Sequence, residues 1–155
     1  MIKQFNPRYR ITVFSNKETT IVEYPITCKF TVTRGVFSES QKAVIQLYNL
    51  APKTRNQIFK DQLNLKPADM KYVHIEAGYN GTMPLIFVGR ILQAYSFKAG
   101  GQTDIITEIQ ATALDIFDSQ SSHTFAAGTT FKDAYKTFAA DMQGVSIGNI
   151  GTLEG

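Results

Sequence analysis

An alternation of apolar and polar side chains with a period of two residues dominates the sequence. It runs through residues 8–13 (RYRITV), and in residues 42–48 (KAVIQLY) it places Ala43, Ile45 and Leu47 on one face. Successive side chains of a β-strand point to opposite sides of the sheet, so this period is typical of strands with one buried face. The pattern predicts a mainly antiparallel β structure, because such sheets can leave one face in water.

Glycine-rich turns separate three long strand-like segments, residues 71–79, 84–98 and 103–114. The Asn-Gly pair at 80–81 and the AGGQ segment at 99–102 supply residues that tolerate a positive φ. We therefore expect two consecutive hairpins, which together form a three-stranded meander.

Three single residues refine the strand prediction. Gly89 lies in the middle of a strand pattern, where a missing side chain favours a β-bulge or a close approach by another backbone. Pro25 separates two β-branched runs and cannot donate to a ladder, which predicts a bend or a sheet edge. Cys28 is the single cysteine, so one chain forms no internal disulfide, and its strand-like surroundings predict a buried structural thiol.

Two segments have helical patterns. In the first, Pro52 stands at the first helical position, and we expect Leu50, Ile58 and Phe59 to face the core together. In the second, residues 129–144 (TTFKDAYKTFAADMQG), apolar residues recur at helical spacing between a cap-like Thr130 and Gly144. Such an apolar stripe indicates core packing more often than a cofactor site.

Length and composition favour one compact domain. The 155 residues are 43% hydrophobic and 19% charged, which is enough apolar material for a core and too little charge for disorder. We predict a barrel or sandwich domain over residues 1–145 with two flanking α-helices, followed by a linker or mobile tail at residues 146–155. The fold class is mainly β, of the α+β type.

Catalytic chemistry finds little support in the residue pattern. His123 has Ser121, Ser122 and Asp118 nearby in sequence, but a serine nucleophile also needs a structural anchor that the local pattern lacks, and His74 lies on a polar strand face. The spacing of Cys, His and acidic residues matches no metal site, and the glycines match no phosphate loop. We therefore expect a protein that is not an enzyme and has no cofactor.

Two further hypotheses on the strand residues stay open at this stage. A Glu108 and Asp115 pair has the residue types of a glycosidase site, although strand-face and turn positions explain both. A stacking face for single-stranded nucleic acid would use Tyr48, Tyr72, Phe87, Tyr95 and Arg90. The net charge of +3 is spread over 16 basic and 13 acidic residues, so it gives only weak support for nucleic-acid binding.

Targeting signals are not visible in the sequence. The segment MIKQFNPRYRITVF has neither the apolar core nor the cleavage site of a secretory signal. The apolar runs are far shorter than the roughly 18 to 20 residues of a membrane helix. We expect a protein made in the cytoplasm of its host, with no membrane partner.

The order of the motifs resembles a known family. Along the chain stand LYNL at 47–50, APKTRNQIF at 51–59, AGY at 77–79, PLIFVGRI at 84–91 and TDIITEIQATALD at 103–115. Over residues 8–145 this order resembles the amino-terminal domain of phage baseplate hub proteins, including the late control protein D group of contractile tails and the hub part of type VI secretion spikes. The resemblance implies a tail-tube-like β-barrel with a flanking helix.

The resemblance also implies a structural role in the virion, in the tail baseplate. Hub domains of this family pack with their own copies into a ring, here a trimer or hexamer, around the tail channel and between tail tube and central spike. The implied partners are the tail tube, the spike, other baseplate proteins and DNA passing through the channel. As alternatives we consider a single-stranded nucleic-acid-binding β-barrel and a small tail adaptor or tube-initiator protein.

Interaction surfaces are therefore the candidate sites. The segment RGVFSES at 34–40 carries Phe37, and the turn from Tyr79 to Met83 also combines large apolar groups with polar ones. Apolar groups of this kind anchor protein interfaces when they are exposed. We predict Phe37, Tyr79 and Met83 as subunit-interface residues.

Overall fold

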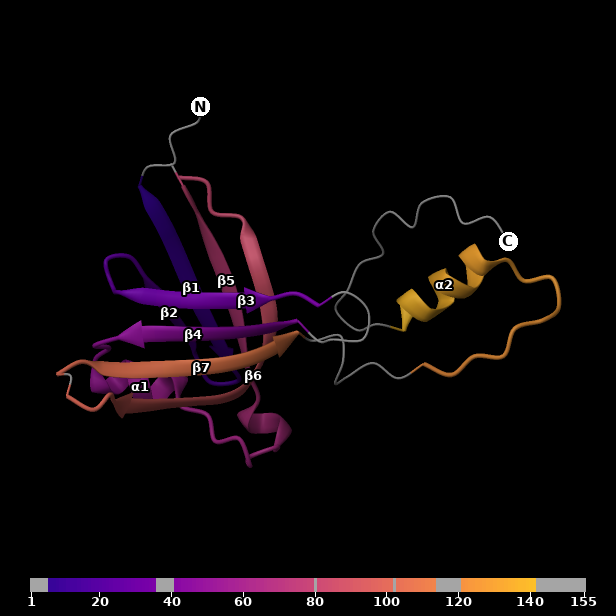
Figure 1. The fold of residues 1–155 in the computed structure, drawn as a ribbon. Coiled ribbons are helices and arrows are strands. Elements are labelled where there is room, and N and C mark those ends of the chain that lie inside the picture. Colours follow the sequence, from indigo (N-terminus) through magenta and orange to yellow (C-terminus); the bar gives the residue numbers. More distant parts are fainter. Residues whose placement is uncertain (1–5, 36–40, 80, 102, 114–120, 142–155) are drawn as a thin grey trace. The chain divides into compact units, whose positions relative to one another are not determined.

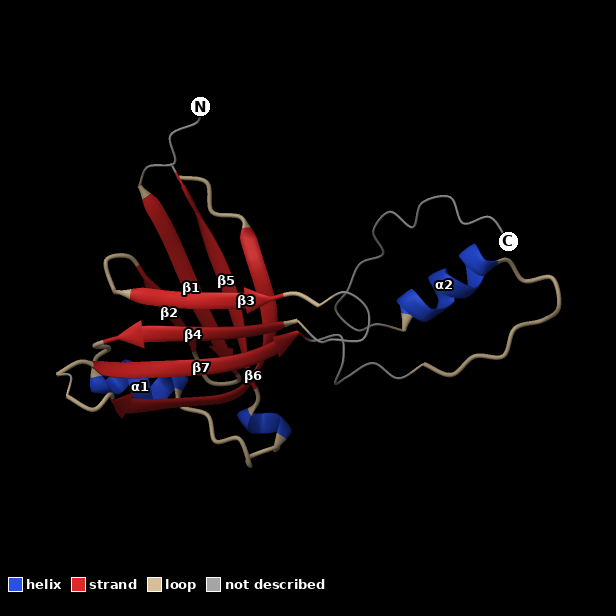
Figure 2. Cartoon of the chain, viewed as in Figure 1, coloured by secondary structure: helices blue, strands red, loops and turns tan. Residues whose placement is uncertain are grey.

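The computed structural model of the chain describes residues 6–35, 41–79, 81–101, 103–113 and 121–141. Within these residues there are seven β-strands, two α-helices and one short 3-10 helix, drawn in Figures 1 and 2. In chain order they are β1 (Pro7–Ser15), β2 (Thr19–Glu23), β3 (Cys28–Thr33), β4 (Lys42–Tyr48), α1 (Pro52–Ile58), η1 (Pro67–Asp69), β5 (Lys71–Tyr79), β6 (Leu85–Lys98), β7 (Ile105–Ala113) and α2 (Phe131–Ala140).

The seven strands form one antiparallel sheet in the order β2-β1-β5-β6-β7-β4-β3. The first part of β6 pairs with β5 and its later part pairs with β7, so this long strand belongs to both halves of the sheet. A register shift between Ile91 and Gln93 marks the change of direction, because bulges bend a strand. Figure 2 shows the resulting half-barrel, in which the two groups of strands cross. The predicted mainly β fold and the β5-β6-β7 meander are confirmed.

Gly89 lies where the two halves of the sheet meet. It pairs with Val73 on one side and with Ala113 on the other. A Cβ atom at this position would be 2.3 Å from the carbonyl oxygen of Thr112 and 2.6 Å from the ring of Phe87. The predicted close approach by another backbone is confirmed, and it explains why glycine is required here.

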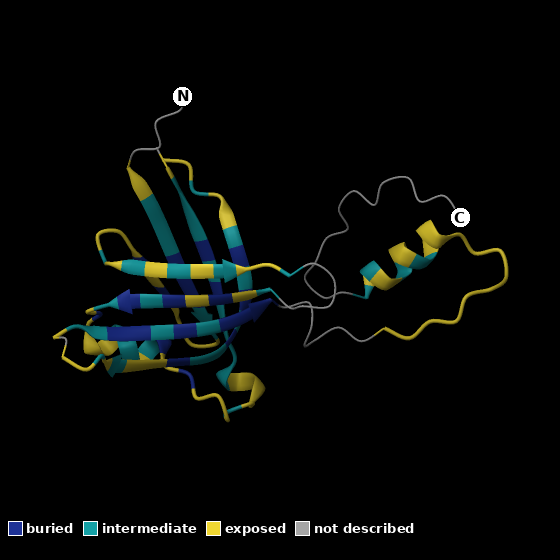
Figure 3. Cartoon of the chain, viewed as in Figure 1, coloured by how far each residue is buried: buried dark blue, intermediate teal, exposed yellow. Residues whose placement is uncertain are grey.

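The core lies on the inner face of the curled sheet. In β4, Ala43, Ile45 and Leu47 are buried, while Val44 is exposed, as the two-residue period predicts. Figure 3 shows the same alternation of buried and less buried residues along the strands. The remaining buried hydrophobic residues in the cluster are Ile11, Val13, Val22, Leu50, Ile58, Val73, Ile75, Phe87, Ile91, Ala94, Ile109, Ala111 and Ala113.

Helix α1 begins at Pro52, as predicted, and its cap residue Ala51 makes no side-chain hydrogen bond. Leu50 and Ile58 are buried, but the prediction for Phe59 is wrong, because 56% of this residue is exposed. The helix ends at Ile58, and Phe59 has non-helical dihedral angles, φ −46° and ψ 133°. Its side chain therefore leaves the buried face of the helix.

A lysine from the next strand completes the end of α1. The ammonium group of Lys71 donates hydrogen bonds to the carbonyl oxygens of Gln57 and Phe59, the latter at 2.8 Å. Carbonyl groups at a helix C-terminus lack partners within the helix, so a cation is favourable there. Burial lowers the pKa of Lys71, partly offset by the nearby charge of Glu18.

The chain divides into two compact units, Met1–Ala113 and Leu114–Gly155. In the second unit, Thr130 caps α2 and accepts a hydrogen bond from the backbone of Asp133, as predicted. The predicted core packing of the α2 stripe is not found, because α2 has no buried residue in Figure 3. The predicted domain limit at residue 145 lies outside the described residues and stays a prediction.

Candidate interaction surface

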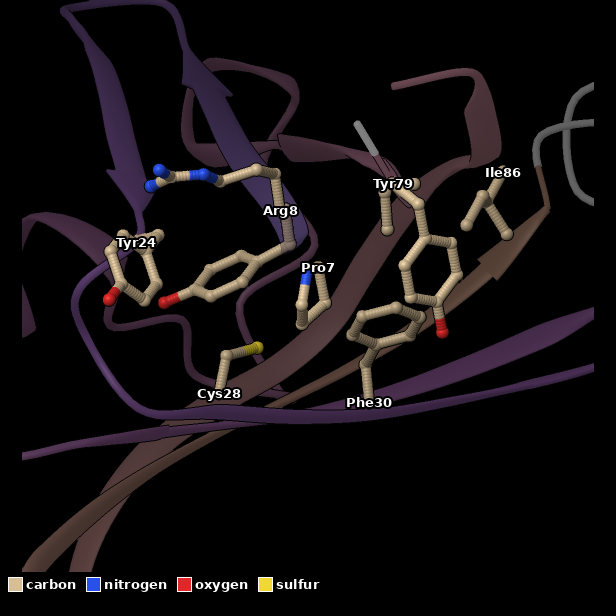
Figure 4. Close-up of a pocket in the computed structure, with 10 residues that line it drawn as sticks. Pro7, Arg8, Tyr24, Cys28, Phe30, Tyr79 and Ile86 are labelled. Atoms are coloured by element: carbon tan, nitrogen blue, oxygen red, sulfur yellow. The ribbon is translucent and has the colours of Figure 1, made fainter. Parts of the chain in front are cut away.

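A largely apolar groove of about 480 Å³ opens at the end of the sheet where β1 begins and β5 ends. In Figure 4 the side chains of Cys28, Phe30 and Tyr79 point toward the same space. The groove is lined by Pro7, Arg8, Tyr9, Tyr24, Cys28, Phe30, Ala77, Gly78, Tyr79 and Ile86. Its residues thus come from four different strands and one turn, and we call it the β1–β3 groove.

A tight turn after β5 sets the position of Tyr79 in the groove. The carbonyl oxygen of Tyr79 accepts a hydrogen bond from the backbone of Thr82 at 3.1 Å, and the Ala77 backbone donates to Pro84 at 3.2 Å. Gly78 makes this geometry possible, since a Cβ atom there would lie 1.9 Å from the Thr82 oxygen. Gly81 has a positive φ of 87°, which confirms the predicted turn.

Two polar groups inside the groove, Tyr9 and Cys28, have raised pKa values. The hydroxyl of Tyr9 donates a hydrogen bond to the backbone oxygen of Ile26. Burial, followed by the charges of Cys28 and Glu23, raises the pKa of Tyr9 to about 12. Burial also raises the pKa of the Cys28 thiol to about 12. Cys28 is only partly buried, so the prediction of a buried structural thiol is correct only in part.

The rim of the groove carries charged side chains of both signs. The guanidinium of Arg8 lies 4.4 Å from the centre of the Tyr24 ring, within the range of a cation–π contact. Arg10 pairs with Glu23 at 3.1 Å and with Glu76 at 3.8 Å. Arg8 and Arg10 thus carry two positive charges and Glu23 and Glu76 carry two negative charges, so these four side chains have no net charge.

The predicted interface residues fall beside this groove where the structure describes them. Tyr79 lines it with 43% of its surface exposed. Met83 lines an adjoining hollow with Tyr9, Tyr24 and two charged residues. Phe37 lies outside the described residues. Sequence reasoning missed Cys28 and Phe30 as groove residues, because strand alternation does not tell which distant strands meet.

The predicted serine, histidine and acid set has a different geometry from a nucleophilic triad. Ser121 donates a hydrogen bond to Asp141 Oδ2 at 2.6 Å, and His123 Nε2 lies 2.5 Å from the same oxygen. The hydrogen bonds from Ser121 and then His123 lower the pKa of Asp141. The serine thus binds the carboxylate, whereas an activated serine binds the imidazole. Asp118 lies outside the described residues.

Glu108 lies in a network of hydrogen bonds on the outer face of the sheet. It accepts from Gln46 at 2.9 Å, from Gln110 at 2.8 Å and from the hydroxyl of Tyr95 at 3.0 Å. The bonds from Gln46 and then Gln110 lower the pKa of Glu108. A glycosidase acid needs a raised pKa, so this environment disfavours that role. Asp115 lies outside the described residues.

The proposed stacking face for nucleic acid is not assembled. Phe87 is only 3% exposed and belongs to the core cluster, whereas Tyr95 lies on the outer face and donates to Glu108. Side chains on opposite faces of a sheet cannot stack on one strand of nucleic acid. The five residues therefore do not form one binding surface.

The described residues offer neither a metal site nor a membrane-spanning helix. They contain no group of three or more His, Cys, Asp or Glu residues placed to hold a metal ion. His74 instead packs its ring against Phe14, with 4.6 Å between ring centres. Among the helices that the structure describes, none combines the length and the hydrophobicity needed to cross a membrane.

Comparison with known proteins gives one family. The model of the family described as "Baseplate hub gp41" matches residues 8–149. This range begins in β1, contains the rest of the sheet and extends beyond α2. No curated protein matches the chain.

Proposed function

Because the chain belongs to the baseplate hub gp41 family, we propose that its copies form a ring around the tail channel, between the tail tube and the central spike. The family match over residues 8–149 is the observation that carries this proposal. As a member, the chain is a structural component of a phage baseplate hub. The ring, its connections and the number of copies, three or six, are the proposed part.

The edges of the half-barrel support self-association. Among the described strands, β2 and β3 each have a hydrogen-bonded neighbour on one side only. An edge strand presents unpaired N–H and C=O groups that another chain can pair with, and proteins usually protect such edges. Ile21, in the middle of β2, is also an exposed apolar residue. A neighbouring copy in a ring would cover these groups, and head-to-tail contacts close such a ring.

The proposed role requires no catalysis. In this proposal the hydrogen bond between His123 and Asp141 connects residues 121–125 to the end of α2. Glu108 holds its neighbours in place on the outer face of the sheet. Tyr79 and Met83 contribute to contacts between subunits, with Phe37 as a further contact. Other baseplate proteins are the expected neighbours, and DNA passes the inner surface of the ring.

Light scattering of the full chain over a concentration series tests this proposal. We expect the mass to rise to that of three or six copies, and negative-stain images of the largest species to show closed rings. A mass that stays at one copy at every concentration contradicts self-assembly into a ring. Binding of single-stranded DNA that weakens steeply with salt would instead favour the nucleic-acid module.

A further inference from the structure

The segment that precedes α2 contacts the C-terminal end of this helix through one histidine. His123 Nε2 lies 2.5 Å from Asp141 Oδ2, and the hydroxyl of Ser121 donates to the same oxygen at 2.6 Å. Asp141 is the residue that caps the C-terminal end of α2, with φ −78° and ψ −16°. The contact therefore joins two parts of the second unit that are 18 to 20 residues apart in the sequence.

Aromatic rings lie beside the imidazole of His123. Its ring centre is 5.9 Å from that of Phe125 and 5.7 Å from that of Phe138. The two phenylalanine rings are 5.5 Å apart and meet edge to face, at an interplanar angle of 73°. Rings in such arrangements attract one another, so they hold the imidazole beside the carboxylate. We call this group the His123 cluster, and its members are Ser121, His123, Phe125, Phe138 and Asp141.

A positive charge is favourable where α2 ends. The last carbonyl groups of a helix lack partners within the helix and give this end a partial negative charge. Asp141 adds a negative charge at the same end. Yet α2 has no basic residue in its last turn, and residues 121–125 (SSHTF) contain neither lysine nor arginine. Among these residues, His123 is the one that can supply a positive charge, and it does so only when it is protonated.

The charged groups around His123 determine how its protonation acts. From α2, the charged group in contact with His123 is Asp141. The charged residues that stand earlier in the helix are Lys132, Asp133 and Lys136. The hydrogen bonds from Ser121 and then His123 lower the pKa of Asp141, so this carboxyl group is ionised at every pH above its ordinary pKa of 3.8. Near neutral pH, the imidazole is therefore the group of the cluster that changes its charge.

From these observations we infer that the His123 cluster responds to pH: protonation of His123 holds residues 121–125 against the end of α2, and loss of the proton loosens them. A neutral imidazole can still donate a hydrogen bond, but it offers no charge to the carboxylate or to the helix end. A charge-assisted hydrogen bond is roughly twice as strong as a neutral one. Loosening frees the rings of Phe125 and Phe138, which are 36% and 39% exposed, for contact with another surface.

The direction of the pH effect follows from the two charges. The contact is strongest where the imidazole is protonated and the carboxylate is ionised. It weakens as the pH rises through the range in which imidazole loses its proton, ordinarily near a pKa of about 6.5. It also weakens as the pH falls through the lowered pKa of Asp141, below 3.8. A mildly acidic solution therefore favours the held form.

Amide hydrogen exchange of the full chain tests this inference. Peptides from residues 121–141 are followed at about pH 5.5 and about pH 8, on either side of the ordinary imidazole pKa. Protection is expressed relative to the unfolded chain, so that the pH dependence of the intrinsic exchange rate cancels. We expect about two- to fivefold more protection at the lower pH, the size of effect that a solvent-accessible charge pair gives. Added salt should reduce this ratio, because it screens the two charges.

Two glutamine substitutions show whether His123 causes the effect. His123→Gln keeps a hydrogen-bond donor that has no charge at either pH, so the ratio of protection should fall to about one. His74→Gln is the matched control, because His74 is the second of the two histidines and lies in β5, where it packs against Phe14. It should keep the ratio of the wild type.

A lysine substitution tests the charge itself. His123→Lys carries a positive charge at both pH values, since the ordinary pKa of lysine is about 10.4. This variant should keep its protection at the higher pH, where the wild type loses protection. It also gives a decisive result if His123→Gln leaves residues 121–125 unprotected at both pH values.

The outcomes decide the inference without reference to ring formation, which light scattering measures separately. A pH dependence that His123→Gln abolishes and His74→Gln retains supports the inference. A wild-type ratio of about one contradicts it, and so does the same ratio in His123→Gln as in the wild type. Loss of protection at the higher pH in His123→Lys, as in the wild type, would also show that the charge of residue 123 does not hold the segment.

Discussion

Replacement of Gly89 by alanine should destabilise the half-barrel at the point where its two halves meet. The new Cβ atom would be 2.3 Å from the Thr112 carbonyl oxygen and 2.6 Å from the Phe87 ring. That carbonyl belongs to β7, and Thr112 is paired with Arg90, so it can move only if the ladder between β6 and β7 is distorted. The contact therefore cannot be relieved by a simple side-chain rotation.

The size of the effect follows from two opposing contributions. Overpacking of this kind costs about 1 to 3 kcal/mol, and a backbone contact puts Gly89→Ala near the upper limit. Alanine also restricts the unfolded chain, which stabilises the folded protein by about 0.4 to 1 kcal/mol. We therefore expect a net loss of about 2 kcal/mol in the free energy of unfolding.

Urea unfolding followed by circular dichroism measures this loss. With a slope of about 2 kcal/mol per molar urea, the midpoint should fall by about 1 M. Gly100→Ala is the matched control, because a Cβ atom there meets nothing within 4 Å. Gly100→Ala should therefore avoid the steric contact and gain only the small stabilisation that comes from restricting the unfolded chain.

A second substitution identifies the group that resists the new methyl. Phe87→Leu removes the ring but leaves the Thr112 carbonyl, so Gly89→Ala should keep more than half of its cost in that background. A free energy of unfolding of Gly89→Ala within about 0.5 kcal/mol of the wild type would contradict this prediction, because the strand would then move without strain.

Three further predictions concern local features. Lys71→Met should lower the free energy of unfolding by about 1 to 2 kcal/mol, because two carbonyl groups at the end of α1 lose their hydrogen-bond donor. The control Lys53→Met, at an exposed position, should change the free energy of unfolding by less than about 0.5 kcal/mol. Thr130→Ala should destabilise α2 by about 1 kcal/mol, visible as faster amide exchange in that helix; unchanged exchange would contradict the capping role. Glu108 has a lowered pKa, so its contribution to stability is present above its ordinary pKa of 4.5 and is lost as the pH falls through the lowered value. Glu108→Gln should therefore make the free energy of unfolding depend less on pH in this acid range. The same pH dependence in the variant and the wild type would contradict this contribution.

The candidate site depended on tertiary structure far more than the strands did. The turn from Tyr79 to Met83 could be proposed from its apolar residues alone, and the structure places both residues beside the β1–β3 groove. The contributions of Cys28 and Phe30 could not be proposed from the sequence, because these residues come from β3, which is distant in sequence from β5 and β6. The exposure of Leu63 and Leu65 after α1 also escaped prediction, since these residues have the same residue type as core leucines.

The sequence alone determined the features that depend on neighbouring residues. The two-residue period in β4, the start of α1 at Pro52 and the Thr130 cap of α2 each follow from the local chain. Side-chain direction in a strand and capping at a helix end involve contacts within a few residues, so their pattern is visible in the sequence.

For other apolar residues, burial depends on contacts that the local sequence pattern does not contain. Phe59 was expected inside and is exposed, whereas Phe87 was considered for a surface and is buried. Gly89 became essential because β7 passes close to it. For Phe87 and Gly89 the cause is contact with a strand distant in the sequence. For Phe59 the cause is that α1 ends at Ile58. The curl of β6 sets these contacts, because it brings β5 and β7 together on one half-barrel.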